Sequence, residues 1–306
     1  MEYIDEVLSL IEQIRFKGYF SPSEDFSNIA ILGMGGSGIV GQLFREIYTK
    51  KPVTVVSDYN IPDFISEKTL VIAVSHSGNT EETIHAMEKC ESRGSRIVII
   101  TSGGKMSAKD HEKVTIPGEL QPRCSLGYML IPILRSFGLF DEKVEGETNR
   151  SLQTVVSIGP DIEKISKSLV DDKKIPVVYG ISPTPSVAYR WKTQFNENAK
   201  MLAFNSAIPE MNHNELAAMP SCYGLENFMF FIAGHPDGRI RKRVEAMEEI
   251  TGVEFHEIPV FSGNVIANTF SAILYGDLLT YYAAVHRGVD PRDVSAITKL
   301  KRILSS

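Results

Sequence analysis

The stretch Ser75–Thr83 gathers hydroxyl side chains and a glycine at one short turn. It follows an apolar run at Thr69–Val74 and precedes a helix-compatible run that opens with the acidic residue Glu81. Such a turn offers backbone N–H groups, the positive end of a helix dipole and several hydroxyls to one small volume, which suits a phosphate monoester. The alternative is that these residues only cap the following helix.

A second turn, Gly33–Gly38, follows the apolar run Asn28–Leu32. Its glycines fit the G-x-G-x-x-G pattern, and Asp58 comes after the next apolar run, near where a dinucleotide-binding fold carries its ribose acid. A dinucleotide would leave the hydroxyl-rich turn without a role, whereas two phosphate-binding turns on adjacent strands can converge on one monophosphate. We therefore favour a small phosphorylated ligand, with a nicotinamide-dependent dehydrogenase as the alternative.

Three other residues could supply acid–base or electrostatic chemistry. Glu197 lies in the polar run Gln194–Lys200 of an otherwise packed helical pattern, where an oriented carboxylate could act as a base. His213, in Asn212–Glu215, could transfer protons near neutral pH, and Arg123 could stabilise a developing oxyanion. The alternatives are a solvated helix face, a loop histidine and a surface salt bridge.

The first half of the chain alternates short apolar runs with helix-compatible stretches. The runs are Ile29–Leu32, Val53–Val56, Leu70–Val74, Arg96–Thr101 and Val114–Ile116. This alternation predicts parallel strands joined by crossover helices, with both faces of the sheet covered. Ligands of such sheets lie beyond the carboxyl ends of the strands, where both turns are expected. A helix over 128–137 would close this half, and the polar segment 141–149 is predicted to be a linker.

A second α/β pattern follows the first. Its helices are expected at Asp161–Leu169 and Val187–Lys200, and its strands at Ile175–Gly180, Phe228–Ala233 and Glu254–Pro259. We predict two doubly wound α/β sandwich domains with mainly parallel central sheets. Residues 1–146 would carry the phosphate site, and residues 147–306 would carry the catalytic base.

Bulk properties narrow the choice of partners and compartment. The chain has 306 residues, 43% of them hydrophobic, and a formal net charge of −6 without a long basic block, so neither nucleic acid nor an anionic membrane is an expected partner. Cys90, Cys124 and Cys222 are scattered and form no C-x-x-C motif, which favours a reducing cytoplasm. The amino terminus lacks the features of a signal peptide.

Two further patterns are excluded. The segment 265–285 is long and apolar, but it contains Asp277 and several hydroxyl residues, so a buried helix explains it better than a membrane span. The seven histidines show no paired ligand spacing, so we expect no metal site, and no G-x-S-x-G turn accompanies a triad.

Five motifs extend over nearly the whole chain. They are Gly35–Ser37, Ser75–Thr83, Pro122–Arg123, Arg190–Lys200 and Asn212–Glu215. Together they resemble the bifunctional phosphoglucose/phosphomannose isomerases of the phosphoglucose isomerase superfamily. The resemblance implies two sugar-isomerase (SIS) domains and a cytoplasmic aldose–ketose isomerase that acts on hexose 6-phosphates without a metal or other cofactor. A non-catalytic sugar-phosphate-sensing module is the alternative.

The resemblance also implies roles for single residues. The phosphate-binding set would be Gly36, Ser37, Ser75, Ser77 and Thr80. Glu197 would move the proton between C1 and C2, and Arg123 would stabilise the enediolate. His213 would act in ring opening, supplied by the partner subunit of a homodimer.

The carboxyl-terminal residues are also matched by resemblance. Lys301 would assist ring opening, and Lys299 lies close enough in the sequence to be the alternative. The family often has a hydroxyl residue a few positions before this lysine, credited with admitting the mannose epimer. The best match here is Val294, so we expect mannose 6-phosphate to form more slowly than glucose 6-phosphate.

Overall fold

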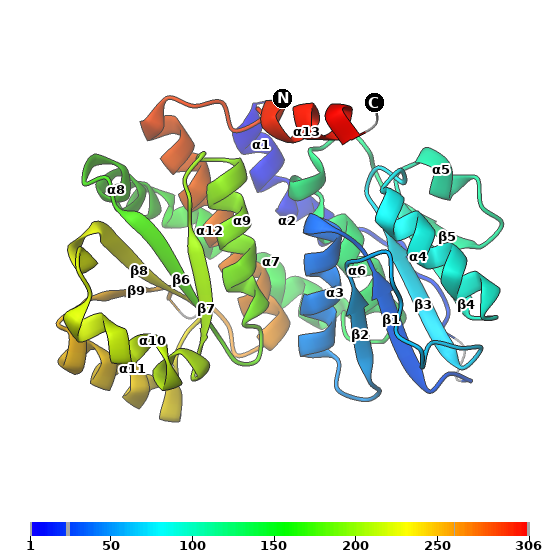
Figure 1. Ribbon diagram of the computed structural model, residues 1–306, viewed down its shortest axis with the longest axis horizontal. Coiled ribbons are helices and arrows are strands. Elements are labelled where there is room, and N and C mark those ends of the chain that lie inside the picture. The colour runs from blue at the N-terminus through cyan, green and yellow to red at the C-terminus, as the bar shows by residue number, and fades with distance from the viewer. Residues whose placement is uncertain (1, 23–24, 260, 305–306) are drawn as a thin grey trace. The chain divides into compact units, whose positions relative to one another are not determined.

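The structure, a computed structural model, describes residues 2–22, 25–259 and 261–304 (Figure 1). The chain divides into two compact units. The N-terminal unit comprises Leu8–Gln153 and Ser262–Phe270, and the C-terminal unit comprises Met1–Val7, Thr154–Phe261 and Ser271–Ser306. Each unit has its own sheet and its own covering helices, so each is described by itself.

The N-terminal unit contains five strands and a set of short and medium helices. Its strands are β1 (Asn28–Leu32), β2 (Val53–Val56), β3 (Thr69–Val74), β4 (Arg96–Thr101) and β5 (Glu112–Thr115). Its helices are α2 (Leu10–Gln13), α3 (Gly35–Ile47), α4 (Glu81–Ser92), α5 (Gly104–Ser107), the 3-10 helix η1 (Pro122–Cys124) and α6 (Leu126–Ser136). Helix α7 (Glu142–Ser157) begins in this unit.

The five strands form a parallel sheet in the order β2-β1-β3-β4-β5. Alternate strand residues face opposite sides, as the two-residue period of a strand requires. Ala73 and Ile99 belong to the cluster that packs with Met87 of α4 and Met106 of α5. Helix α3 covers the other face, where it lies against Ile31. Both faces are therefore buried, which explains the continuous apolar runs in the sequence.

The C-terminal unit has a smaller sheet and longer helices. Its strands are β6 (Ile175–Ile181), β7 (Phe204–Ile208), β8 (Phe228–Ala233) and β9 (Phe255–Glu257). Its helices are α1 (Tyr3–Leu8), α8 (Gly159–Asp171), α9 (Ser186–Glu197), α10 (Glu215–Ala218), α11 (Gly238–Thr251) and α13 (Ser295–Leu304), with most of α12 (Val265–Arg287). Three 3-10 helices join them: η2 (Glu210–His213), η3 (Met219–Ser221) and η4 (Leu225–Asn227).

The second sheet is also parallel, with the order β7-β6-β8-β9. On one face, the Trp191 and Phe195 rings of α9 pack against Phe231 at centroid distances of 6.1 and 6.2 Å. On the other face, Tyr179 and Phe230 lie in a cluster covered by η2, η3 and α11. The prediction of two α/β domains with parallel central sheets is thus confirmed.

Several sequence predictions need correction. Residues 141–149 are not a linker, because α7 begins at Glu142, and Glu145 on it accepts hydrogen bonds from Lys17 at 2.8 Å and Arg135 at 2.5 Å. Strand β7 was missed, because it lies at the sheet edge and is half-exposed over most of its length. The proposed domain boundary at 146/147 stays a prediction.

The segment 265–285 forms a buried helix, as predicted, because α12 buries Phe270, Leu274 and Leu279. Over the residues that the structure describes, no helix is long and apolar enough to cross a membrane.

Candidate active site

The two glycine- and hydroxyl-rich turns leave neighbouring strands. β1 and β3 are hydrogen-bonded partners, with Leu32 opposite Ala73, so both turns emerge at the same edge of the sheet. The strand order reverses direction between β1 and β3, because β2 lies on one side of this pair and β4 on the other. In open α/β sheets, such a switch point is where ligands bind. This is the arrangement of flavodoxin-like sheets and not the strand order of dinucleotide-binding domains.

The turn after β3 is held by its own side chains. Ser75 is buried, and its Oγ accepts a hydrogen bond from the Gly78 N–H at 3.1 Å and lies 3.0 Å from Thr80 Oγ1. Gly78 has φ +65°, and a Cβ on it would lie 1.8 Å from the Gly103 carbonyl oxygen, so only glycine fits. Ser77 is exposed at the apex of this turn. Two hydroxyls and the N-terminus of α4 are thereby brought together.

The turn after β4 supports this first turn from the side. The N–H and Oγ of Ser102 both donate to the His76 carbonyl oxygen, at 3.0 and 2.6 Å. The Lys105 N–H donates to Asn79 Oδ1 at 3.0 Å, and the Met106 N–H to the Gly78 oxygen at 3.0 Å. Residues 75–80 are therefore braced against a neighbouring loop.

Gly36 and Ser37 lie in the first turn of α3. Ser37 is buried, and its Oγ is 3.4 Å from the sulfur of Met129 on α6. A Cβ on Gly36 would lie 3.9 Å from Arg123 Cα and from the Pro122 oxygen. The N-terminus of α3 and the 3-10 helix that carries Arg123 are therefore in close contact.

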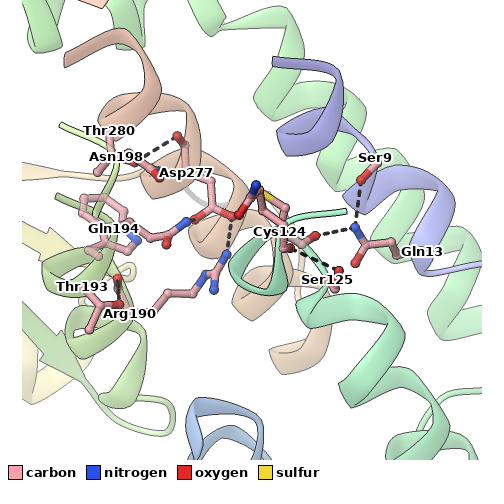
Figure 2. A network of polar contacts seen from close by, with 12 residues as sticks. Ser9, Gln13, Cys124, Ser125, Arg190, Thr193, Gln194, Asn198, Asp277 and Thr280 are labelled. Atoms are coloured by element: carbon pink, nitrogen blue, oxygen red, sulfur yellow. Dashed lines mark hydrogen bonds and ion pairs between the residues drawn. The ribbon is translucent and has the colours of Figure 1, made fainter. Parts of the chain in front are cut away.

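Arg123 is 7% exposed and lies in η1, and helix α2 fixes that segment. Gln13 Nε2 donates to the Cys124 carbonyl oxygen at 2.6 Å and to Ser9 Oγ at 2.9 Å (Figure 2). Gln13 Oε1 accepts from the Tyr128 N–H at 3.3 Å. The interpretation of Arg123 as part of a surface salt bridge is wrong, because its side chain is buried. The structure thus brings the backbone of Arg123 close to the Gly36 turn.

Glu197 is the last residue of α9 and is half-buried. Lys200 has φ +54°, and its Nζ donates to the Glu197 carbonyl oxygen, which closes the end of the helix. A carboxylate at a helix C-terminus lies at the negative end of the helix macrodipole, which is unfavourable. The stability of α9 therefore does not explain why a glutamate stands at position 197.

Three buried polar residues, here called the polar ladder, lie around Glu197 at four-residue intervals. Arg190 and Gln194 lie on one face of α9, and Asn198 directly follows the helix; all three are nearly inaccessible to solvent. They contact Asp277 and Thr280 on α12 (Figure 2). The interpretation of Gln194–Lys200 as a solvated helix face is therefore wrong for Gln194 and Asn198, whereas Asn196, Glu197 and Lys200 are half-buried.

His213 and Lys301 lie on other elements of the C-terminal unit. His213 ends η2 and is exposed, while Glu215 in the same motif accepts a hydrogen bond from Tyr179 Oη at 3.0 Å. Lys301 lies on α13, and its side chain is outside the part of the structure that is described. Val294 precedes that helix and is half-buried.

A cavity of about 470 Å³ lies in the C-terminal unit, on the face of the sheet opposite α9. Its lining includes Tyr179, Phe204, Glu215, Cys222 and Phe230, and none of the predicted site residues. Within the described ranges, no group of three or more histidine, cysteine, aspartate or glutamate residues could hold a metal ion.

Comparison with known proteins identifies the family. Residues 25–125 match the SIS domain, and residues 161–304 match the bacterial phospho-glucose isomerase C-terminal SIS domain. The bifunctional phosphoglucose/phosphomannose isomerase of Thermoplasma acidophilum is 44% identical, over 100% of this chain and 98% of that one. The enzyme of that name from Caldicellulosiruptor bescii is 36% identical, over 92% and 91%. The chain belongs to the family of bifunctional phosphoglucose/phosphomannose isomerases.

The fold of this isomerase family is shared more widely. The C-terminal domain of glucosamine-fructose-6-phosphate aminotransferase from Francisella tularensis superposes with a TM-score of 0.74 at 13% identity, covering 94% of this chain and 96% of that one. At this identity the likeness concerns the fold alone. The family assignment confirms the resemblance found in the sequence, and the roles of single residues stay predictions.

Sequence reasoning missed two residues that hold the segments on which predicted site residues lie: Gln13 contacts the segment of Arg123, and Asp277 contacts the helix of Glu197. Gln13 lies in a four-residue helix, where nothing in the sequence distinguishes it from a surface glutamine. Asp277 was noticed only as a charge inside an apolar segment. An acidic residue in the middle of a buried helix was itself the signal, because such a charge requires a partner.

One histidine next to the phosphate-type turns has a perturbed pKa. Burial lowers the pKa of His76 below its ordinary value, and a hydrogen bond to the backbone of Pro117 partly opposes this. His76 is 7% exposed, and its Nε2 has no hydrogen-bond partner among the described residues. The ring is therefore neutral in the folded protein near pH 7.

We expect His76 to contribute to the pH dependence of the free energy of unfolding. In the unfolded chain, His76 takes up a proton below about pH 6.5, whereas in the folded protein its lowered pKa opposes protonation. The contribution of neutral His76 to the free energy of unfolding is therefore complete above that pH and is lost as the pH falls. Urea unfolding of the wild type and of His76→Gln should show a smaller loss in the variant between about pH 7.5 and 5. Equal losses would mean that His76 does not couple folding to pH.

Proposed function

We propose that this protein interconverts glucose 6-phosphate and, more slowly, mannose 6-phosphate with fructose 6-phosphate through an enediol(ate), with no metal or other cofactor. The observation that carries the proposal is the pair of turns at the β1/β3 switch point beside buried Arg123, in a chain of this isomerase family. An aldose and a ketose differ only by the position of protons, so a base, an oxyanion stabiliser and a ring-opening group are sufficient.

The phosphate of the substrate would bind at the two turns of the N-terminal unit. Backbone N–H groups at the start of α3 and α4 favour an anion, and the helix dipoles add to this attraction. The proposed contacts are the Gly36 N–H and the hydroxyls of Ser37, Ser75, Ser77 and Thr80. Because the turn after β3 is braced by Ser102 and packs closely on Gly103, little ordering of that turn would be needed on binding.

The chemistry would occur at the other end of the sugar. Glu197 would remove a proton from C1 or C2 and return it to the neighbouring carbon, and Arg123 would stabilise the enediolate oxygen. Return of the proton to C2 on either face of the planar intermediate yields one epimer or the other. Val294 cannot hydrogen-bond to the C1–C2 fragment, which supports slower formation of the mannose epimer.

The ring-opening group would come from a second subunit. In one chain, Glu197 precedes the amino end of β7, whereas His213 follows its carboxyl end. This strand has five residues and spans roughly 16 Å. That separation supports a homodimer in which His213 completes the partner's site, with Lys301 or Lys299 assisting. A cytoplasmic location is part of the same proposal, supported by the three free cysteines.

The products made from fructose 6-phosphate test the proposal directly. Purified protein treated with a chelator should form glucose 6-phosphate first and mannose 6-phosphate more slowly, and added NAD should change neither rate. NMR of the sugar phosphates distinguishes the two products. Glucose 6-phosphate alone would restrict the protein to one epimer, and dependence on a metal or on NAD would contradict the mechanism.

Glu197→Gln should abolish isomerisation and leave sugar-phosphate binding nearly intact. The amide keeps the shape of the carboxylate but cannot accept a proton, so kcat should fall by about a thousandfold or more. Turnover is measured by NMR, and binding by titration with an unreactive sugar-acid phosphate.

The matched comparison for this variant is the double replacement Ser75→Ala/Thr80→Ala. It should weaken phosphate binding by about a hundredfold or more, because two charge-assisted hydrogen bonds are lost, and should leave the ratio of the two epimers unchanged. Substantial turnover by Glu197→Gln would exclude Glu197 as the base. Unchanged affinity in the double variant would move the phosphate site elsewhere.

Mixing two inactive variants tests the shared site. When Glu197→Gln and His213→Ala are unfolded together and refolded, half of the dimers should be hybrids with one intact site. Activity should then return to about a quarter of the wild-type value, as expected for twofold-symmetric dimers. Refolding each variant alone provides the control. No recovery in the mixture would mean that Glu197 and His213 act within one chain or not at all.

A further inference from the structure

We infer that Asp277 is a positioning residue for the isomerisation: its buried carboxylate fixes the register of α9 on α12 and thereby the position of Glu197. The inference rests on the proposed role of Glu197 as the base. It concerns a residue 80 positions further along the chain, on a different helix.

One carboxylate contacts two successive turns of α9. Asp277 is 5% exposed, and its Oδ2 accepts a hydrogen bond from Arg190 Nη2 at 2.6 Å. Its Oδ1 accepts from Gln194 Nε2 at 2.9 Å. Figure 2 shows both side chains of α9 turned toward this one aspartate. Because the two donors lie four residues apart, a single acceptor between them fixes both the rotation and the height of the helix.

A second anchor follows Glu197 directly. Asn198 Nδ2 donates to Thr280 Oγ1 on α12 at 3.0 Å (Figure 2). Asn198 Oδ1 accepts from Tyr3 Oη on α1 at 2.6 Å. Two residues later, the Lys200 carbonyl oxygen accepts from Arg287 Nη1 of α12 at 3.0 Å. The base is therefore bracketed by contacts to α12, one turn before it and immediately after it.

Stability alone does not explain a buried ion pair at this interface. The desolvation of two charges offsets most of their attraction, and apolar residues of similar size hold helices together as well or better. An apolar contact is already present, because Trp191 stacks on Tyr275 with centroids 5.6 Å apart and planes 6° apart, and a Cβ on Gly276 would lie 2.2 Å from Trp191 Nε1.

The contribution of the polar ladder is to fix the register of α9 on α12. A helix that slides by one residue moves about 1.5 Å and turns about 100°, and Arg190 and Gln194 would then no longer reach Asp277. A proton transfer requires the base within hydrogen-bond distance of the carbon-bound proton, and a displacement of about 1 Å can lower the rate about a hundredfold. Loss of the polar ladder should therefore lower kcat, while KM should stay near its wild-type value, because none of the proposed phosphate contacts belongs to the ladder.

The test compares two charge-balanced double variants. Arg190→Met/Asp277→Leu removes the buried pair without leaving an unpaired charge, so the protein should fold. We expect kcat for fructose 6-phosphate to fall between about tenfold and a hundredfold, with KM within about twofold of the wild type. Affinity for an unreactive sugar-acid phosphate should be unchanged. The control, Arg241→Met/Glu257→Leu, removes the pair that joins α11 to β9 in the same unit, where Arg241 Nη2 lies 2.7 Å from Glu257 Oε2, and should leave kcat unchanged.

A second variant tests the inference if Arg190→Met/Asp277→Leu does not fold. Gln194→Met removes one contact to Asp277 and leaves the ion pair in place, and it should lower kcat several-fold with KM unchanged. Wild-type kcat in a folded Arg190→Met/Asp277→Leu protein, or in Gln194→Met, would overturn the inference, as would an equal loss of kcat in the control. Two other results would contradict the proposed function itself. They are the absence of isomerisation by the wild type and full activity of the Glu197→Gln variant.

Discussion

The pairing of β1 with β3 is the constraint on which the phosphate-type site depends. The chain leaves β1 to form β2 on one side, returns, and forms β3 on the other side of β1. The helices that follow the two strands therefore cover opposite faces: α3 packs on the face of Ile31, and α4 on the face of Ala73. The amino ends of both helices are left at one edge, where their N–H groups and dipoles act on the same space.

In the C-terminal unit, the residue to be positioned lies at the end of a helix and not in a turn after a strand. Helix α9 follows β6 and returns along the sheet, so its last residue, Glu197, lies toward the amino end of β7 and not at the edge where η2 begins. Loops at strand ends are braced by backbone hydrogen bonds, but a residue at a helix end moves with its helix. The buried contacts from α9 to Asp277 and Thr280 supply the constraint that such a position otherwise lacks.

The sequence predicted most of the first sheet to within one or two residues, because strands buried on both faces are continuous apolar runs bounded by turns. β7 could not be found in this way, since an edge strand with Asn205 and Ser206 resembles a loop. The phosphate-type turns were visible because their residues are adjacent in the sequence. The pairing of Arg190 with Asp277 was not, because 87 positions separate them and no local pattern links the two helices.

The contrast between local turns and long-range helix contacts explains how one fold can carry several reactions. A solved structure at 13% identity keeps this fold with a TM-score of 0.74, so the strand order survives almost complete replacement of the sequence. A switch point, where ligands bind, comes with that strand order. A base at the end of a helix does not, because its position depends on a particular set of buried polar partners on a second helix. In this protein, Arg190, Gln194 and Asn198 are those partners: they join the end of α9 to α12 and so fix the place of Glu197, the proposed base.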